Sequence, residues 1–161
     1  MPKFARLVCA AAVCAVVSVL PTTAWAGDPT LMIDRLEDQP ITVDRAEFAP
    51  KDPEWLRTLA LHVKNTSAKQ INYVEFSVSL SGIDGDTVDY TLRFGVADTP
   101  HQTDPKLVIN PDKMAKIQWT GDDYKGLKKA LASGHIFYPA AAVFRLHTVG
   151  FADGSTWKDR R

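Results

Sequence analysis

Cysteine is almost absent from this chain, and the two that occur, Cys9 and Cys14, both lie in one apolar run near the N-terminus. We therefore expect no disulfide framework beyond that run, so the domain must rely on a hydrophobic core. An excess of one charge is also missing, because 19 basic residues stand against 19 acidic ones. This balance offers no electrostatic footprint for nucleic acid or for an anionic membrane, and we expect neither as a partner.

Long hydrophobic stretches are limited to a single run, Leu7–Leu20. A helix that spans a bilayer needs about 20 apolar residues, and this run is shorter. Lys3 and Arg6 precede it, and the letters AWA at 24–26 supply small residues where signal peptidase cleaves. This layout is typical of a secretory signal peptide. We predict cleavage after Ala26, a secreted or periplasmic location, and no stable membrane insertion of the processed chain.

Signatures of catalysis are missing as well. Ser67, Ser133 and Ser155 lack the Gly-x-Ser-x-Gly elbow, and no spacing pairs them with a histidine and a carboxylate. The chain is therefore interpreted as non-catalytic, and no cofactor is predicted.

Two patterns keep metal binding open as an alternative, although no metal is predicted. Asp84, Asp86 and Asp89 could offer oxygen ligands to calcium, but Asp and Gly are also the ordinary residues of a tight turn. His62 and His147 each fall on a predicted strand, so their rings could share a zinc ion if those strands were neighbours. Either site requires these side chains to converge on one point.

What the chain does contain is a series of short stretches that alternate apolar and polar residues. The clearest is LALHVKNTSAKQINYVEFSVSL at 59–80, where two alternating runs flank the polar letters NTSAKQ. Alternation with period two predicts strands with one buried face. Short polar side chains favour a turn, so we predict that the two strands pair across it. Asn65 is interpreted as a turn residue, although NTS is formally an acceptor for N-linked sugar.

Further stretches complete the predicted fold. The period changes from two to three and four only at 121–134, which predicts one short amphipathic helix lying over an open end, with Gly134 as its stop. Asp153 and Gly154 predict a closing hairpin. Other strands are expected at 41–48, 88–95, 113–120 and 141–151.

The predicted fold class is all-β: an immunoglobulin-like antiparallel β-sandwich of six to seven strands with one short amphipathic helix. We divide the chain into a signal peptide at 1–26, a lead-in segment at 27–40 and the β-sandwich domain at 41–161.

A resemblance supports this interpretation. Residues 59–80 resemble a pattern of small exported bacterial β-sandwich domains, in which a strand ending in Val-x-Asn-x-Ser/Thr leads through a short basic turn to a Tyr/Val-rich strand. The FxLYD-type domains are one example. The ending VGFADGSTW at 149–157 is similar to the closing hairpin of uncharacterised secreted domains of this size. The resemblance implies an exported, accessory, immunoglobulin-like module without known chemistry.

Four residues form the predicted binding site. Trp55 sits in a charged loop predicted at 49–55, and Tyr73 lies opposite the inner face of its strand, with Glu75 two residues on. If Trp55 and Tyr73 meet near the face that carries His62, they form an exposed aromatic patch suited to a protein or glycan partner.

Three functions follow from these predictions. The leading one is a secreted or periplasmic binding module of unknown specificity, which requires Trp55 and Tyr73 to be exposed and close together. A metal-binding or hydrolytic protein on the same scaffold is the first alternative. The second is a structural subunit of a cell-envelope assembly, in which an exposed strand edge pairs with a partner.

Overall fold

The computed structural model describes residues 27–95 and 107–160, so the predicted signal peptide lies outside it. Its elements are β1 (Thr30–Asp34), β2 (Ile41–Glu47), α1 (Trp55–Thr58), β3 (Ala60–Asn65), β4 (Ile71–Gly82), β5 (Thr87–Gly95), β6 (Met114–Gln118), α2 (Gly121–Ser133), β7 (Pro139–Phe151) and β8 (Thr156–Lys158). None of the helices in these two ranges is long and apolar enough to cross a membrane.

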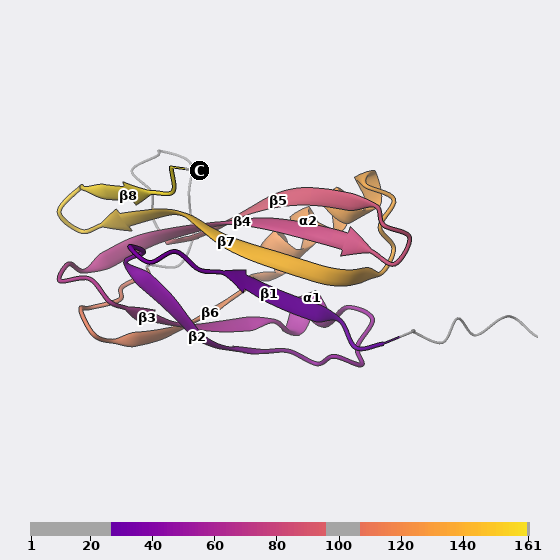
Figure 1. Ribbon diagram of the computed structural model, residues 1–161, viewed down its shortest axis with the longest axis horizontal. Helices are drawn as coiled ribbons and strands as arrows, with labels where there is room; N and C mark the ends of the chain where they lie inside the picture. The colour runs from indigo at the N-terminus through magenta and orange to yellow at the C-terminus, as the bar shows by residue number, and fades with distance from the viewer. Residues whose placement is uncertain (1–26, 96–106, 161) are drawn as a thin grey trace, which may run out of the picture.

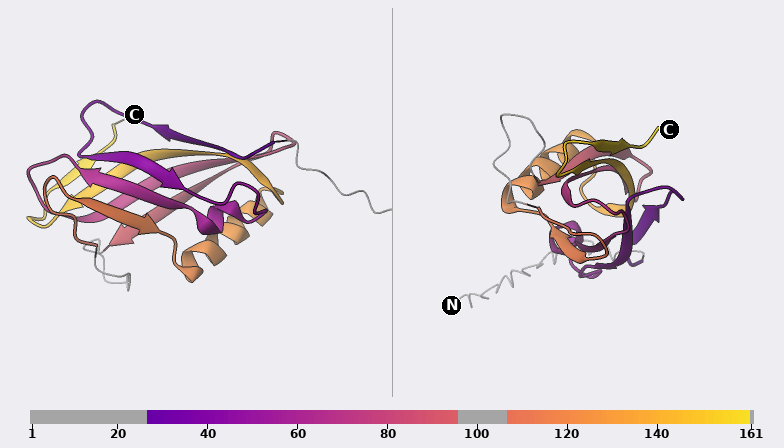
Figure 2. Two further views of the ribbon diagram at one scale, coloured as in Figure 1. Left: turned by 90° about the horizontal axis from the view of Figure 1, so that it is seen from below. Right: turned by 90° about the vertical axis from the view of Figure 1, so that its left-hand side faces the viewer.

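The strands form two facing sheets, as Figure 1 shows. One sheet has the order β1-β7-β4-β5, with β8 also paired to β7, and the other has the order β2-β3-β6. Helix α2 lies along one side of the sheets (Figure 2), with Leu127 and Leu131 buried. The prediction of a mostly β, two-sheet protein with one amphipathic helix is therefore confirmed.

The core lies between the sheets because alternate residues of each strand point inward. Val74, Phe76, Val78 and Leu80 of β4 are all buried, as their alternation predicts. The ring of Phe76 contacts that of Phe144 on β7 edge to face, with 6.2 Å between the ring centres. Such pairs add to the stability that comes from removing apolar area from water.

Strands β3 and β4 do not pair, so the predicted hairpin at 59–80 is wrong. They belong to different sheets, and the chain crosses from one layer to the other at Asn65. The Asn65 side chain is fully buried, and its Nδ2 donates to the carbonyls of Lys69 at 2.8 Å and Ile109 at 2.9 Å. Its Oδ1 accepts hydrogen bonds from the Ser67 amide and hydroxyl. Asn65 is thus a turn residue, and its amide is enclosed in the folded chain.

The predicted lead-in segment at 27–40 is also corrected, because it contains a strand. Strand β1 pairs with β7 in parallel, so the five-stranded sheet is not wholly antiparallel. Leu31 and Ile33 pack against the core, and therefore the sheet starts before residue 41. The segment looked irregular in sequence because β1 is short and lies at an edge, where none of its residues is fully buried.

Candidate binding surface

The predicted aromatic patch does not exist, because Trp55 and Tyr73 are both buried. Trp55 begins the single helical turn α1, in a stretch that was predicted to be a loop. Its indole Nε1 donates to the carbonyl oxygen of Pro139 at 2.8 Å, and its ring packs against Phe48 with 5.0 Å between ring centres. The charged residues beside Trp55 in the sequence concealed this buried position.

Tyr73 and Glu75 belong to a polar cluster on the outer face of the five-stranded sheet. The Tyr73 hydroxyl donates to Glu75 Oε2 at 2.6 Å, and Arg93 Nε on β5 donates to the same oxygen at 2.9 Å. His147 Nε2 on β7 lies 3.7 Å from Glu75 Oε1. The cluster therefore includes side chains of β4, β5 and β7, and the Glu75 carboxylate accepts two short hydrogen bonds within it.

These contacts change the proton affinity of both groups. Burial raises the pKa of the Glu75 carboxyl, but the hydrogen bonds from Tyr73 and Arg93 outweigh it and bring the pKa below its usual value. Burial, and then the hydrogen bond to Glu75, raise the pKa of the Tyr73 hydroxyl well above its usual value. At neutral pH the cluster therefore holds a neutral tyrosine and an ionised glutamate, which gives no activated nucleophile.

His62 lies on the other sheet, away from this cluster. Its Nε2 is 3.2 Å from Glu47 Oε1 on β2, without the alignment of a hydrogen bond. Because His62 and His147 are on different sheets, the shared zinc site that the sequence left open is not formed. The described residues hold no group of three or more potential ligands among His, Cys, Asp and Glu, including at Asp84–Asp89.

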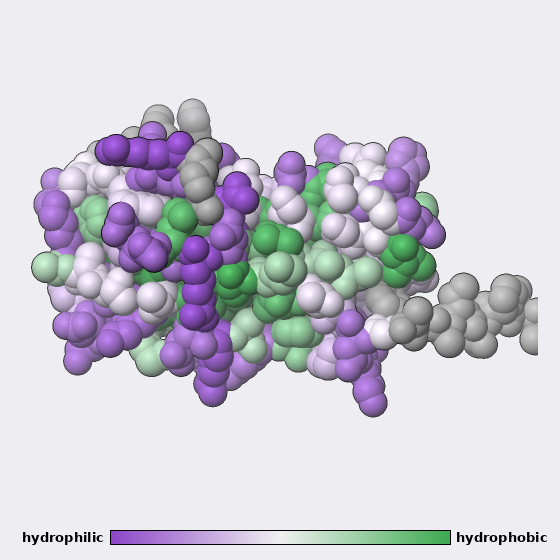
Figure 3. Space-filling model, viewed as in Figure 1, coloured by the Kyte–Doolittle hydropathy of each residue, from purple (hydrophilic) through white to green (hydrophobic). Residues whose placement is uncertain are grey.

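Large apolar side chains are exposed together at one end of the molecule. Ile83, Phe137 and Tyr138 are 65%, 79% and 45% exposed, and we name this group the apolar tip. Ile83 lies in the turn between β4 and β5, and the other two lie between α2 and β7. Gly82 is paired with Pro139 in the sheet, which brings the two segments side by side. Figure 3 shows hydrophobic surface at the end where the β4–β5 turn lies.

A recess of about 300 Å³ lies at the apolar tip. The β4–β5 turn forms one wall and is held by two backbone hydrogen bonds, Gly82 N to Asp86 O and Gly85 N to Gly82 O. Gly85 has a φ of 87°, a left-handed conformation that glycine adopts without steric cost. The residues lining the recess are Gly82, Ile83, Asp84, Asp86, His135, Ile136, Phe137 and Tyr138.

The other wall is fixed by the C-terminal end of α2. The Ile136 amide donates to Leu131 O, and the His135 amide donates to Ala132 O, which together form a Schellman motif. His135 occupies the left-handed position of that motif, with a φ of 57°, where glycine is the usual residue. Gly134 was predicted as the helix stop, but its φ of −85° shows that the left-handed residue is the next one.

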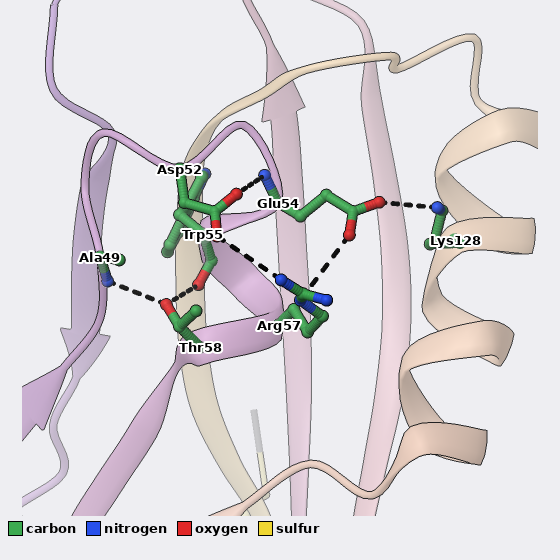
Figure 4. A network of polar contacts seen from close by, with 7 residues as sticks. All are labelled: Ala49, Asp52, Glu54, Trp55, Arg57, Thr58 and Lys128. Atoms are coloured by element: carbon green, nitrogen blue, oxygen red, sulfur yellow. Dashed lines mark hydrogen bonds and ion pairs between the residues drawn. The ribbon is translucent and has the colours of Figure 1, made fainter.

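A second recess of about 170 Å³ lies between α1 and α2, and Phe137 borders both recesses. Charged contacts hold its rim, as Figure 4 shows: Glu54 accepts from Lys128 Nζ of α2 at 2.7 Å. Arg57 lies 3.7 Å from Glu54 and 3.8 Å from Asp52. These carboxylates have cations beside them, so the second recess presents no unpaired acidic group of this network to a partner.

The sequence prediction missed the apolar tip. A signal was present, because an isoleucine in a Gly/Asp-rich turn and the pair Phe137–Tyr138 just after a helix stop are placed where chains are usually polar. Only the fold shows that these residues, more than fifty positions apart, share one recess.

No family model, curated protein or solved structure matches this chain.

Proposed function

We propose that this protein is a non-catalytic binding module, exported to the periplasm or secreted, and that it binds a partner with its apolar tip. The observation that carries the proposal is the joint exposure of Ile83, Phe137 and Tyr138 around one recess. Large exposed side chains on adjacent loops contribute little to folding, and clusters of them mark interaction sites. Loops positioned by a rigid scaffold are also where binding residues concentrate.

We propose, further, that the two sheets have immunoglobulin-like connections. The support is the strand order: β2-β3-β6 corresponds to strands A, B and E of that fold, and β4, β7 and β8 correspond to C, F and G. The crossing from β3 to β4 then takes the place of the B–C connection between the layers. Helix α2 fills the connection between E and F, which places its C-terminal end beside the turn that holds Ile83.

Export is tested separately from binding. When the full chain is expressed with its N-terminal segment in a bacterial host, we expect the recovered protein to lie outside the cytoplasm and to start at Gly27. Cell fractionation gives the location of the protein, and the intact mass gives its first residue. Recovery of the unprocessed chain from the cytoplasm would contradict this part of the proposal.

Binding is tested with one exchange at the tip and one matched control. Phe137→Ser removes the most exposed tip side chain, and Met32→Ser removes an exposed apolar side chain from β1. Each purified protein is immobilised and exposed to envelope extract. We expect Phe137→Ser to retain at least about tenfold less partner than the natural chain, whereas Met32→Ser should retain as much as the natural chain. Equal retention by both variants, with circular dichroism unchanged, would remove the tip from the proposal.

A further inference from the structure

The recess at the apolar tip carries two carboxylates that no cation of the described residues pairs with. Asp84 and Asp86 both line it and both are exposed. Within the described ranges neither carboxylate forms an ion pair, in contrast to Glu54, which contacts Lys128 and Arg57. Among the described residues that line the recess, His135 is the one basic side chain.

This combination of surfaces is complementary to one kind of side chain. Lysine and arginine lay an aliphatic stem along apolar surface while their charged head stays near water or a carboxylate. Phe137 and Ile83 offer the apolar surface, Phe137 also offers a ring face for a cation, and Asp84 and Asp86 offer the counter-charge. A volume of about 300 Å³ accommodates one or two such side chains.

We propose that the recess at the apolar tip binds a cationic segment of a partner protein, in which lysine or arginine alternates with aliphatic or aromatic residues. The inference deepens the proposed function, because it names the chemistry of the partner bound by the same tip. Apolar contact supplies most of the affinity, since exposed ion pairs contribute little each. The two carboxylates supply selectivity and speed of association.

Two other occupants fit these observations less well. A second copy of the chain would bring the same carboxylates face to face across a two-fold axis, and three side chains bury far less than the roughly 1,200 Å² of a stable interface. A neutral glycan would leave the charges of Asp84 and Asp86 without a counter-charge, and the side chains of Ile83 and Ile136 offer it no hydrogen bonds.

The test uses three capped hexapeptides with the processed chain. The first is acetyl-Gly-Leu-Lys-Phe-Lys-Gly-amide, the second replaces both lysines by norleucine, and the third replaces both by glutamate. Backbone amide shifts in two-dimensional NMR locate binding, and titration gives the dissociation constant. We expect the lysine peptide to shift the signals of 82–86 and 135–138, and to bind about fivefold or more tightly than the norleucine peptide. The glutamate peptide should bind more weakly than either.

Two variants connect this preference to the recess. The double exchange Asp84→Asn and Asp86→Asn keeps the size of both side chains, and we expect it to make the lysine and norleucine peptides bind equally. Asp44→Asn removes an exposed carboxylate from β2 and should leave the fivefold preference intact. Raising the salt concentration from about 50 to about 500 mM should weaken the binding of the lysine peptide only.

The outcomes separate this inference from the proposed function. If the norleucine peptide binds at the tip as tightly as the lysine peptide, the cationic partner is overturned while the tip remains a binding surface. Binding of neutral oligosaccharides at the tip, without the lysine peptide, overturns it in favour of a glycan. Dimers in sedimentation that Phe137→Ser abolishes overturn it in favour of a second copy. If Phe137→Ser retains as much partner from envelope extract as the natural chain does, the proposed function itself is overturned.

Discussion

A Cβ atom built on Gly126 would lie 2.5 Å from the hydroxyl oxygen of Tyr90, so α2 reaches β5 only because residue 126 has no side chain. In the sequence this glycine reads as a weak point of the helix, since glycine costs about 1 kcal/mol relative to alanine in a helix. In the fold it is a point where the Tyr90 side chain of β5 lies directly against the helix.

The effect of Gly126→Ala on the free energy of unfolding should therefore depend on the residue at position 90, and it should change sign when Tyr90 is replaced by Phe. In the natural chain Gly126→Ala should destabilise, because the new methyl group meets the Tyr90 hydroxyl. In a Tyr90→Phe background the nearest ring atom is 3.6 Å from the methyl, an ordinary contact, so Gly126→Ala should stabilise by about 1 kcal/mol. Urea unfolding of the four proteins measures both effects. The same sign in both backgrounds would contradict the close approach.

The second prediction concerns Asn65, whose side chain joins the β3–β4 crossing to the segment that precedes β6. Asn65→Ala removes the side-chain donor to two backbone carbonyls in a buried setting, and should cost about 2–3 kcal/mol in the free energy of unfolding. Ser67→Ala removes a hydroxyl from the more exposed side of the same turn and should cost less than about 1 kcal/mol. Comparable losses in the two variants would show that the buried amide has no special role.

The third prediction is a pH dependence that comes from Glu75. Its pKa is lower in the folded chain than in the unfolded chain, so its stabilising contribution is present above the unfolded value of about 4.3 and is lost as the pH falls through the folded pKa. When the pH is lowered from about 7 to about 2.5, the midpoint of urea unfolding should fall less in Glu75→Gln than in the natural chain. Glu37→Gln, at an exposed glutamate outside the cluster, serves as control. A fall in Glu75→Gln equal to that of the natural chain would contradict the shifted pKa.

The fourth prediction uses the left-handed residue at the end of α2. His135→Gly should stabilise the protein by about 0.5–1 kcal/mol, because a left-handed φ is unfavourable for a residue with a Cβ. Gly134→Ala should destabilise instead, since its Cβ would lie 3.0 Å from that of Val88. Thermal unfolding of the two variants distinguishes the roles of these neighbouring residues. Destabilisation by His135→Gly would mean that the imidazole has contacts that outweigh the backbone strain.

Local pattern was sufficient to predict the strands after residue 40 and most of their buried faces, although it missed β1. The alternation at Val74, Phe76, Val78 and Leu80 reports which side of a strand is apolar, and this depends only on the geometry of an extended chain. The same alternation does not report which strand is the neighbour. The crossing at Asn65 depends on a hydrogen bond to Ile109, 44 residues away, so a turn signal alone could not distinguish a hairpin from a change of sheet.

The candidate site was less predictable for a related reason. The burial of Trp55 depends on Pro139, its partner 84 residues on, while its sequence neighbours are charged. The apolar tip was missed because exposure is a property of the assembled surface. Ile83 and Phe137 belong to separate connections, and the pairing of β4 with β7 is what places them at one recess.

The parallel pairing of β1 with β7 has a consequence for the order in which the domain can be completed. Asp34 and Arg145 form an ion pair although 111 residues separate them, so the first strand of the sheet has no place to dock until the last long strand has been made. A ribosome that delivers the chain from its N-terminus therefore synthesises most of it before this sheet can be completed. Such long-range pairing favours slow folding, and it leaves an interval in which a chaperone can bind the incompletely folded polypeptide.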